Sequence, residues 1–308
     1  MIKKHSSNKS LKEYLKKGLL FLLLLIILDN GINYFLLNGL YQYYGLYNKN
    51  KIALVGHSHL MLGIDKVKME KELHVNISKY TREGVNIVER DLMINQLLKS
   101  NQQLKLIVYA VDAWMFTGEG LSKNSYKQFY PFMGENTIKN YVYKNASLED
   151  YWQHRLIKSS RYNEGLVSGS FRGYLKSWDN LKVGAVDTIT LDSDIKKGNF
   201  RRIVSSSKNR RIFENTIKKI SEKNIKTILL YVPTTSRYNN AEMEKFNLEI
   251  AYFKSIESKF KNVIFLDYNV LYSSNTSLFY DRIHLNPEGQ KLVTNSFIEY
   301  LQKHFTTN

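Results

Sequence analysis

The sequence predicts an α/β fold in which helices cover both faces of a parallel β-sheet. Short runs rich in Leu, Ile and Val recur along the chain, and longer segments with helical spacing of apolar residues follow most of them. Strands that are apolar throughout and alternate with helices are typical of parallel sheets buried on both faces. A chain of 308 residues, 43% of them hydrophobic, is long enough to bury such a core.

Each element has its own signal. Apolar runs that end at Gly, Pro or polar residues predict strands at 51–55, 104–111, 226–232 and 263–266, and a weaker one at 73–77. Helical spacing predicts helices at 85–98, 212–221 and 241–260. A last helix is expected after Asn286, which can cap it, because Pro287 suits the first helical position and Glu288 favours the positive end of the helix dipole.

Residues 113–208 interrupt this alternation with many Trp, Tyr and Phe residues and no regular strand-helix pattern. We interpret them as an insertion, or lid, within an α/β domain of residues 45–308. Its aromatic residues would either pack a small core of their own or form a surface that stacks on sugar rings or contacts an acyl donor.

The N-terminus predicts a membrane anchor. Six lysines among the first 17 residues precede an apolar run, Gly18 to Leu28, and apolar residues continue to Leu40. A basic stretch before an apolar segment is an insertion signal whose lysines stay inside. We expect residues 1–44 to be a cytoplasmic tail and an uncleaved signal-anchor helix, with the rest outside the cell membrane. A cleaved signal peptide and a buried soluble helix are the alternatives.

Composition narrows the classes further. The net charge of +17 comes mostly from lysines scattered along the chain, and its densest cluster, near residues 201–211, carries no nucleic-acid-binding motif. We therefore expect no nucleic-acid partner, although the charge can attract the chain to an anionic envelope surface. Because the chain has no cysteine, disulfides, thiol catalysis and thiolate metal sites are excluded.

Two segments at opposite ends of the chain carry the candidate chemistry. Ser58 follows the first predicted strand, and Asp281 and His284 precede the last helix. A serine hydroxyl is a poor nucleophile until an imidazole removes its proton, and the imidazole needs a group that fixes its tautomer. Each feature alone has a structural explanation, a helix cap or a surface turn, but the two together predict a Ser-His-Asp arrangement.

These segments, Gly56-His57-Ser58 and Asp281-Arg282-Ile283-His284 before Pro287-Glu288-Gly289, resemble the first and last signature blocks of SGNH (GDSL-like) hydrolases. The resemblance covers about residues 50–301. It implies a flavodoxin-like three-layer sandwich with Ser58 as nucleophile, His284 as base and Asp281 as its orienting acid, and no cofactor. The anchor and the insertion look more like the envelope acyl-transfer branch, whose members work beside a membrane-bound O-acyltransferase.

The chain departs from that family at three positions. His57 replaces the usual Asp, the Gly block matches only at Gly84, and Asp112 replaces the family's Asn. Oxyanion stabilisation would fall to the Ser58 and Gly84 amides, with help from Asn86. Asp112 falls at an oxyanion position, where a carboxylate would be unfavourable, so either it points elsewhere or the enzyme is slow or specialised.

The function expected is serine-dependent O-acyl transfer or ester hydrolysis on an envelope glycan. The alternative is a decayed site in an anchored glycan-binding or scaffold partner of the O-acyltransferase. His57 and His59 flank Ser58 as a metal pair would, but no third ligand is apparent in the sequence, so we expect no metal.

Overall fold

The computed structural model describes residues 4–47, 49–117, 123–178 and 181–305. Three residues of the predicted basic tail, 1–3, and residues 118–122 and 179–180 of the predicted insertion lie outside the described residues. The chain divides into two compact units. One combines residues 1–40 with 126–171, and the other combines residues 41–125 with 172–308. The predicted division at residue 45 and the predicted lid stay predictions.

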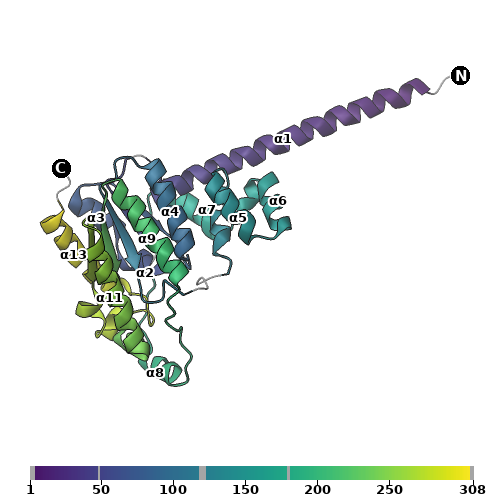
Figure 1. The fold of residues 1–308 in the computed structure, drawn as a ribbon. Coiled ribbons are helices and arrows are strands. Elements are labelled where there is room, and N and C mark those ends of the chain that lie inside the picture. The colour runs from purple at the N-terminus through teal and green to yellow at the C-terminus, as the bar shows by residue number, and fades with distance from the viewer. Residues whose placement is uncertain (1–3, 48, 118–122, 179–180, 306–308) are drawn as a thin grey trace. The chain divides into compact units, whose positions relative to one another are not determined.

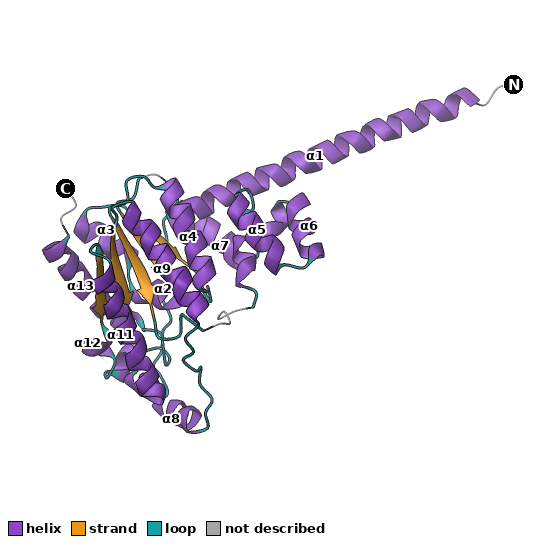
Figure 2. Cartoon of the chain, viewed as in Figure 1, coloured by secondary structure: helices purple, strands orange, loops and turns teal. Residues whose placement is uncertain are grey.

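The larger unit is built on five parallel strands in the order β2-β1-β3-β4-β5 (Figure 2). Their bounds are β1 Ile52–Gly56, β2 Ile77–Thr81, β3 Leu106–Val111, β4 Lys226–Tyr231 and β5 Val263–Asp267. The α/β class predicted from the sequence is confirmed, and this strand order is that of flavodoxin-like sheets.

Helices cover both faces of the sheet (Figure 1). One layer consists of α4 (Ile87–Ser100), α9 (Ser207–Glu222) and α11 (Met243–Lys259). The other consists of α2 (Ser58–Gly63), α3 (Lys66–Leu73) and α13 (Pro287–His304). Apolar side chains of the second layer, Val293 and Phe297 among them, bury the strand residues Leu54 and Val108 completely. The buried strands thus follow the apolar runs of the sequence.

Most predicted elements lie within a few residues of their expected positions, and one is wrong. The second strand was expected at 73–77, but Leu73 ends α3, and β2 begins only at Ile77. His74 leaves the helix in the left-handed conformation, with φ of 54°. The strand itself reads Ile-Ser-Lys-Tyr-Thr, and Lys79 is buried because its ammonium donates to the main-chain oxygens of Met61 and Ile64. Such a strand lacks the apolar signal of its neighbours.

The sheet order explains where a site can form. From β1 the chain moves outward to β2 and then returns across β1 to β3, so the connections leave the carboxyl ends of β1 and β3 in opposite directions. Ligands of such sheets bind in the crevice at this switch point. The residues that follow β1, β2 and β3 therefore meet at one edge. Shorter elements complete the unit: α8 Thr188–Lys196, α10 Ser236–Asn239, η3 Asn240–Glu242, α12 Asn269–Tyr272 and η4 Thr276–Leu278.

The smaller unit combines most of a long N-terminal helix with a helical bundle. Helix α1, Lys4–Tyr44, has a segment, Leu11–Tyr44, that is long and apolar enough to span a membrane. The bundle follows the order η1 Ser125–Phe132, α5 Asn136–Asn145, α6 Leu148–Leu156, η2 Ser159–Arg161 and α7 Glu164–Leu175. Its aromatic residues are divided, because Phe129 and Phe132 are buried whereas Trp152 is exposed. The bundle therefore packs a small core and also leaves apolar side chains on its surface.

Candidate active site

Ser58 is held at the carboxyl end of β1. The strand ends at Gly56, where an added Cβ would lie 2.4 Å from the Cβ of Ala110 on the neighbouring strand, so only glycine fits. His57 then caps α2, and its Nδ1 accepts the N–H of His59 at 3.0 Å. Ser58 is the first residue of α2, so its own N–H has no partner within the helix and is free to face a ligand.

His284 and Asp281 meet Ser58 from the other end of the chain. The Oγ of Ser58 lies 2.8 Å from Nε2 of His284. Nδ1 of His284 lies 2.8 Å from Oδ2 of Asp281. This arrangement requires Nδ1 to donate to the carboxylate, which leaves the Nε2 lone pair to accept the serine proton. The structure thus brings together the three residues that the sequence analysis paired.

The turn that carries His284 is fixed by the same carboxylate. Oδ1 of Asp281 accepts the N–H groups of Ile283 and His284, both at 2.9 Å. The carbonyl of Arg282 accepts the N–H of Thr235 at 3.1 Å and its hydroxyl at 3.0 Å. Burial raises the pKa of Asp281, but the hydrogen bond and charge of His284 outweigh it and hold the pKa below its ordinary value. Asp281 therefore stays ionised.

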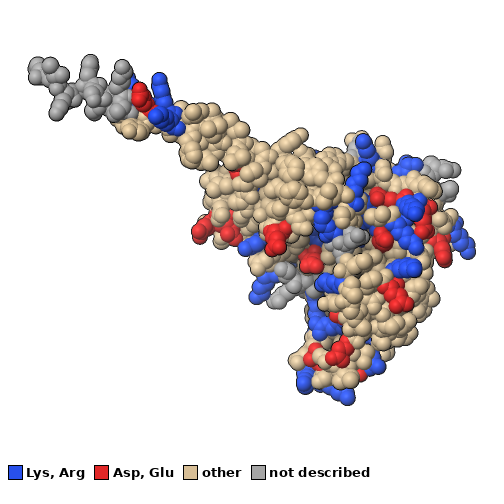
Figure 3. All heavy atoms as spheres, turned by 180° about the vertical axis from the view of Figure 1, so that it is seen from behind, with Lys and Arg blue, Asp and Glu red and all other residues tan. Residues whose placement is uncertain are grey.

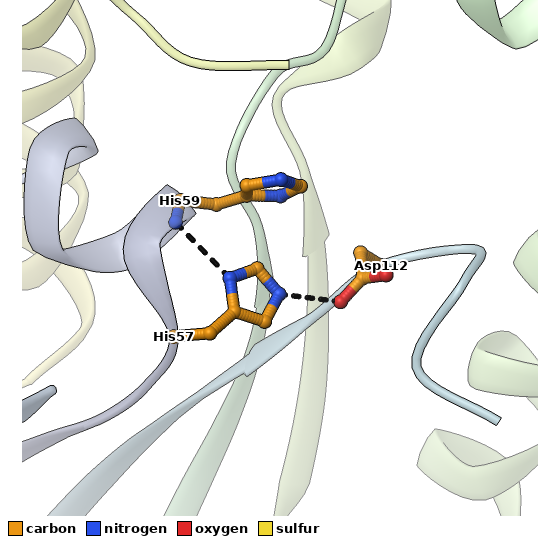
Figure 4. Close-up of side chains that lie close together, drawn as sticks. All are labelled: His57, His59 and Asp112. Atoms are coloured by element: carbon orange, nitrogen blue, oxygen red, sulfur yellow. Dashed lines mark hydrogen bonds and ion pairs between the residues drawn. The ribbon is translucent and has the colours of Figure 1, made fainter. Parts of the chain in front are cut away.

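Asp112 follows β3 and lies against His57 in a buried network (Figure 4). Its Oδ2 accepts Nε2–H of His57 at 2.6 Å and lies 3.5 Å from Nη2 of Arg90. Its Oδ1 accepts the N–H of Trp114 at 2.9 Å. Burial raises the pKa of Asp112, whereas His57 and Arg90 lower it strongly. The carboxylate that the sequence marks as unfavourable is thus ionised and compensated by two hydrogen-bond donors and the guanidinium of Arg90.

The two buried histidines are neutral. Burial lowers the pKa of His57 to about 4, helped by the positive charge of Arg90 and opposed by Asp112. Burial also lowers the pKa of His59 well below its ordinary value. His57 therefore serves as a neutral link that caps α2 through Nδ1 and holds Asp112 through Nε2.

The sequence shows no third ligand beside His57 and His59, but the fold supplies one in Asp112. The ligand atoms of these three side chains lie within 4.8 Å of one another, and Nδ1 of His59 is buried with no hydrogen-bond partner in the described part of the chain. However, two ligands about 2.0–2.2 Å from one tetrahedral ion lie roughly 3.4 Å apart, well beyond the 2.6 Å between His57 and Asp112. Arg90 would also repel a dication, so the cluster fits a hydrogen-bonded network better than a metal centre.

The expected oxyanion residues divide into two groups. Gly84, in the left-handed conformation with φ of 68°, lines the same cavity as Ser58 and Asp112. Asn86 instead caps α4, where its Oδ1 accepts the N–H of Glu89 at 3.0 Å, and it is not among the residues that line the cavity. The Ser58 and Gly84 amides remain the expected oxyanion donors, whereas the ionised carboxylate of Asp112 carries no N–H.

The cavity beside Ser58 has a volume of about 210 Å³ and is also lined by five residues outside the predicted catalytic and oxyanion set: Trp114, Arg201, Tyr238, Arg282 and Ile283. Trp114 and Tyr238 are buried neighbours with ring centroids 4.9 Å apart. Arg282 could have been found, because it lies within the Asp281–His284 turn. Arg201 stands out in the sequence only as part of the basic cluster near residues 201–211, which gives no indication that tertiary contacts bring it to the cavity.

No family model matches the sequence, and no curated protein matches it. Solved structures with similar folds include a Streptococcus pneumonia protein whose description names platelet activating factor (12% identity, 93% of this chain and 98% of that chain, TM-score 0.44). A second is a Desulfitobacterium hafniense protein described as a lipolytic protein of the G-D-S-L family (11% identity, 81% of this chain and 98% of that chain, TM-score 0.39). A third is a catalytic mutant of an acetylxylan esterase from Geobacillus stearothermophilus (9% identity, 82% of this chain and 94% of that chain, TM-score 0.40).

These similarities are too weak to assign an activity. They include the G-D-S-L family that the sequence resembles, but identities of 9–12% and TM-scores below 0.5 leave the geometry of Ser58, His284 and Asp281 as the stronger guide.

Asp281→Asn should keep the turn and lose activity. The amide oxygen can still accept the N–H groups of Ile283 and His284, but an N–H would face Nδ1 of His284 and favour the wrong tautomer. We expect the rate of ester cleavage to fall by about 10²–10⁴ with little change in melting temperature. Asp267→Asn is the matched control, because Asp267 also accepts a main-chain N–H two residues ahead, at 2.9 Å. Equal rates in the two variants would contradict the assigned role.

The neutral state of His57 should make stability depend on pH. Its pKa is about 4 in the fold and 6.5 when unfolded, so the unfolded chain binds more protons between these values. The contribution is complete above pH 6.5 and is lost as pH falls toward 4, by roughly 3 kcal/mol in all. Thermal unfolding of the full chain in detergent should show a smaller loss over this range for His57→Gln. The exposed control His304→Gln should leave the pH dependence of stability unchanged. The same result for His57→Gln would refute the role of His57 in this dependence.

Proposed function

We propose that the chain is an SGNH-type serine enzyme that transfers or hydrolyses an ester-linked acyl group through an acyl-Ser58 intermediate. The observation that supports this most is the continuous path of two 2.8 Å contacts from Ser58 through His284 to Asp281. The path joins residues 226 positions apart in the sequence. A helix cap or a surface turn would need neither of these contacts.

In the proposed reaction, Nε2 of His284 takes the proton of Ser58 as Oγ attacks the ester carbonyl carbon. The imidazolium is stabilised by Asp281, and the N–H groups of Ser58 and Gly84 face the oxyanion. His284 then gives the proton to the departing alkoxide, which leaves as an alcohol. In the second half, His284 removes a proton from water or a sugar hydroxyl, whose oxygen attacks the acyl-Ser58 carbonyl. His284 then returns the proton to Oγ of Ser58 as the bond between Oγ and the acyl carbon breaks.

Water as acceptor would make the chain an esterase, and a glycan hydroxyl would make it an O-acyltransferase. We propose an envelope glycan as the substrate, because α1 can span a membrane and the lysines before its apolar run favour an extracytoplasmic position for the rest of the chain. A membrane-bound O-acyltransferase is the partner that would supply the acyl group.

The alternative is an anchored glycan-binding or scaffold protein with a decayed site. His57 and Asp112 suggest this alternative, because they differ from the residues usual in the family that the sequence resembles. Their mutual hydrogen bond and the charge of Arg90 give these two substitutions a compatible structure, and the path from Ser58 to Asp281 remains intact. These contacts favour catalysis over the scaffold.

A fluorophosphonate probe should label the full chain in detergent at Ser58, because only an activated serine oxygen attacks phosphorus at a useful rate. Ser58→Ala should lose both the label and the cleavage of short aryl esters while its melting temperature stays near that of the parent. The exposed Ser277→Ala is the control and should keep both. A labelled or active Ser58→Ala protein would exclude the proposed mechanism, and an unlabelled parent chain would favour the scaffold.

A further inference from the structure

Two guanidinium groups line the cavity beside Ser58. Arg282 lies with its guanidinium carbon 5.2 Å from the centroid of the Tyr238 ring, and no carboxylate of the described residues is within ion-pair distance of it. Arg201 is fixed through its main chain, whose N–H donates to the Tyr238 hydroxyl and whose carbonyl accepts Nε1–H of Trp114, both at 3.0 Å. Its guanidinium donates to the hydroxyl of Thr117.

The negative charge in this cavity does not balance these two cations. Asp112 is the one carboxylate among the described residues that line it, and Asp112 already faces Arg90 and the N–H groups of His57 and Trp114. The two histidines beside it are neutral. A half-buried guanidinium without a carboxylate partner is costly, and its planar donors match a carboxylate or a phosphate.

We propose that the substrate carries an anionic group, a carboxylate or a phosphate, close to its reactive ester, and that Arg282 and Arg201 bind it. This inference rests on the proposed function and names its substrate class. An acidic glycan would present such a group, whereas a neutral acylated sugar would bring no anion to either guanidinium.

Three acetate esters of similar shape test this in the full chain: 4-acetoxybenzamide, 4-acetoxybenzoate and 4-acetoxyphenyl phosphate. Each kcat/KM is divided by the rate of alkaline hydrolysis of the same ester to remove differences in leaving group. We expect one or both anionic esters to be preferred over the amide, and Arg282→Gln to reduce that preference about tenfold or more, as loss of a charged hydrogen bond would. The larger preference identifies the anion.

The controls separate this inference from the function on which it rests. Arg237→Gln, which removes an exposed arginine paired with Asp192, should keep the preference of the parent. An equal loss on all three esters in Arg282→Gln would mean that Arg282 serves the oxyanion or the turn, and it would overturn the anionic substrate. Cleavage of all three esters without preference would do the same, whereas cleavage of none would reject the esterase itself.

A second surface belongs to the smaller unit. Helix α6 exposes a stripe of Leu148, Trp152 and Leu156, which are 64%, 54% and 73% exposed and lie one helical turn apart. Tyr151, beside it, turns inward and is buried. Arg155 borders one side of the stripe, and Glu149 and Gln153 border the other. A helix with Leu and Trp on one face and charges around it is typical of the membrane interface.

The stripe is attached to the membrane-spanning helix at a defined point. Just beyond α6, the N–H groups of Lys158 and Ser159 donate to the carboxylate of Asp29, at 3.0 and 2.7 Å. Asp29 is the first charged residue after the apolar run of α1. Figure 3 shows this run as an uncharged band between the basic end of α1 and the bundle. The C-terminal end of α6 therefore lies where α1 stops being fully apolar.

The length of the run brings α6 toward the lipid. Gly18 to Leu28 spans about 16 Å as a helix, roughly half of a 30 Å hydrocarbon core. Flanking residues must enter the membrane to cover the difference, and on the side of Asp29 they carry the end of α6 with them. We propose that the Leu148-Trp152-Leu156 stripe lies in the lipid interface beside the anchor.

Single cysteines test this directly, because the chain contains none. The full chain, reconstituted in vesicles of phosphatidylcholine and phosphatidylglycerol, would carry an environment-sensitive fluorophore at residue 148, 152 or 156. We expect lipids with a shallow doxyl group to quench these labels more than labels at two exposed controls. The controls are Gln153, about 100° around the same helix, and Val270 in the larger unit.

Other outcomes overturn the proposal in distinguishable ways. Quenching at the three sites no stronger than at Gln153 would place the stripe in water. If the labels are shielded from iodide and this shielding disappears when the protein is diluted in lipid, a second copy of the chain covers the stripe. A label at Leu23 that lipid quenchers do not reach would reject the anchor, and the proposed contact with it.

Discussion

The candidate site depends on one carboxylate. Asp281 closes its own turn by accepting two main-chain N–H groups and orients the imidazole of His284 with its other oxygen. The same carboxylate therefore stabilises the turn of residues 281–284 and selects the tautomer of His284. The turn is further held where Tyr280 donates its N–H to the carbonyl of His284 and where Asn286 donates to Leu278. A residue near the C-terminus is thereby presented to a serine that follows the first strand.

A second carboxylate, Asp112, shows how a buried charge is tolerated beside Ser58, the proposed nucleophile. In the proposed reaction, the carboxylate of Asp112 lies where it would repel the negative charge of the oxyanion. However, its oxygens are directed to His57, Arg90 and Trp114. Arg90 is itself anchored by the carbonyl of Ala110 at 3.0 Å. The pair is buried almost completely, with side-chain exposures of 1% and 4%, so removing either partner would leave an unpaired buried charge. The buried charges of Arg90 and Asp112 therefore compensate each other only while both residues are present.

The sequence predicted the parts of this molecule that follow from local pattern. The apolar strands, the cap at Asn286 and the pairing of Ser58 with Asp281 and His284 each depend on residues close in sequence or on a strong motif. The contact between His57 and Asp112 was within reach, because both follow strands that are neighbours in a sheet of this order. Taken one at a time, however, His57 resembles a metal ligand and Asp112 a poor oxyanion residue, and neither pattern indicates that the two are partners.

Other features could not be predicted because their cause is tertiary. β2 is more polar in sequence than its neighbours, and its Lys79 is buried with two carbonyl partners that the sequence does not indicate. Arg201 reaches the cavity because Trp114 and Tyr238 bind its main chain from elements far apart in the sequence. No periodicity records such contacts, since each depends on where the sheet brings the partner.

The charge balance around Ser58 follows from which groups are neutral. If His57 or His59 were protonated, the cavity would gain a fixed cation close to the serine, and Arg201 and Arg282 would add to it. Burial keeps both imidazoles neutral, so the positive charge that remains is carried by guanidinium groups, which keep their charge at any physiological pH. Recognition of an anion would therefore not switch off when His284 changes protonation during the reaction. Separating the permanent charge, on arginines, from the transient charge, on His284, allows one small cavity both to hold an anionic group and to move a proton.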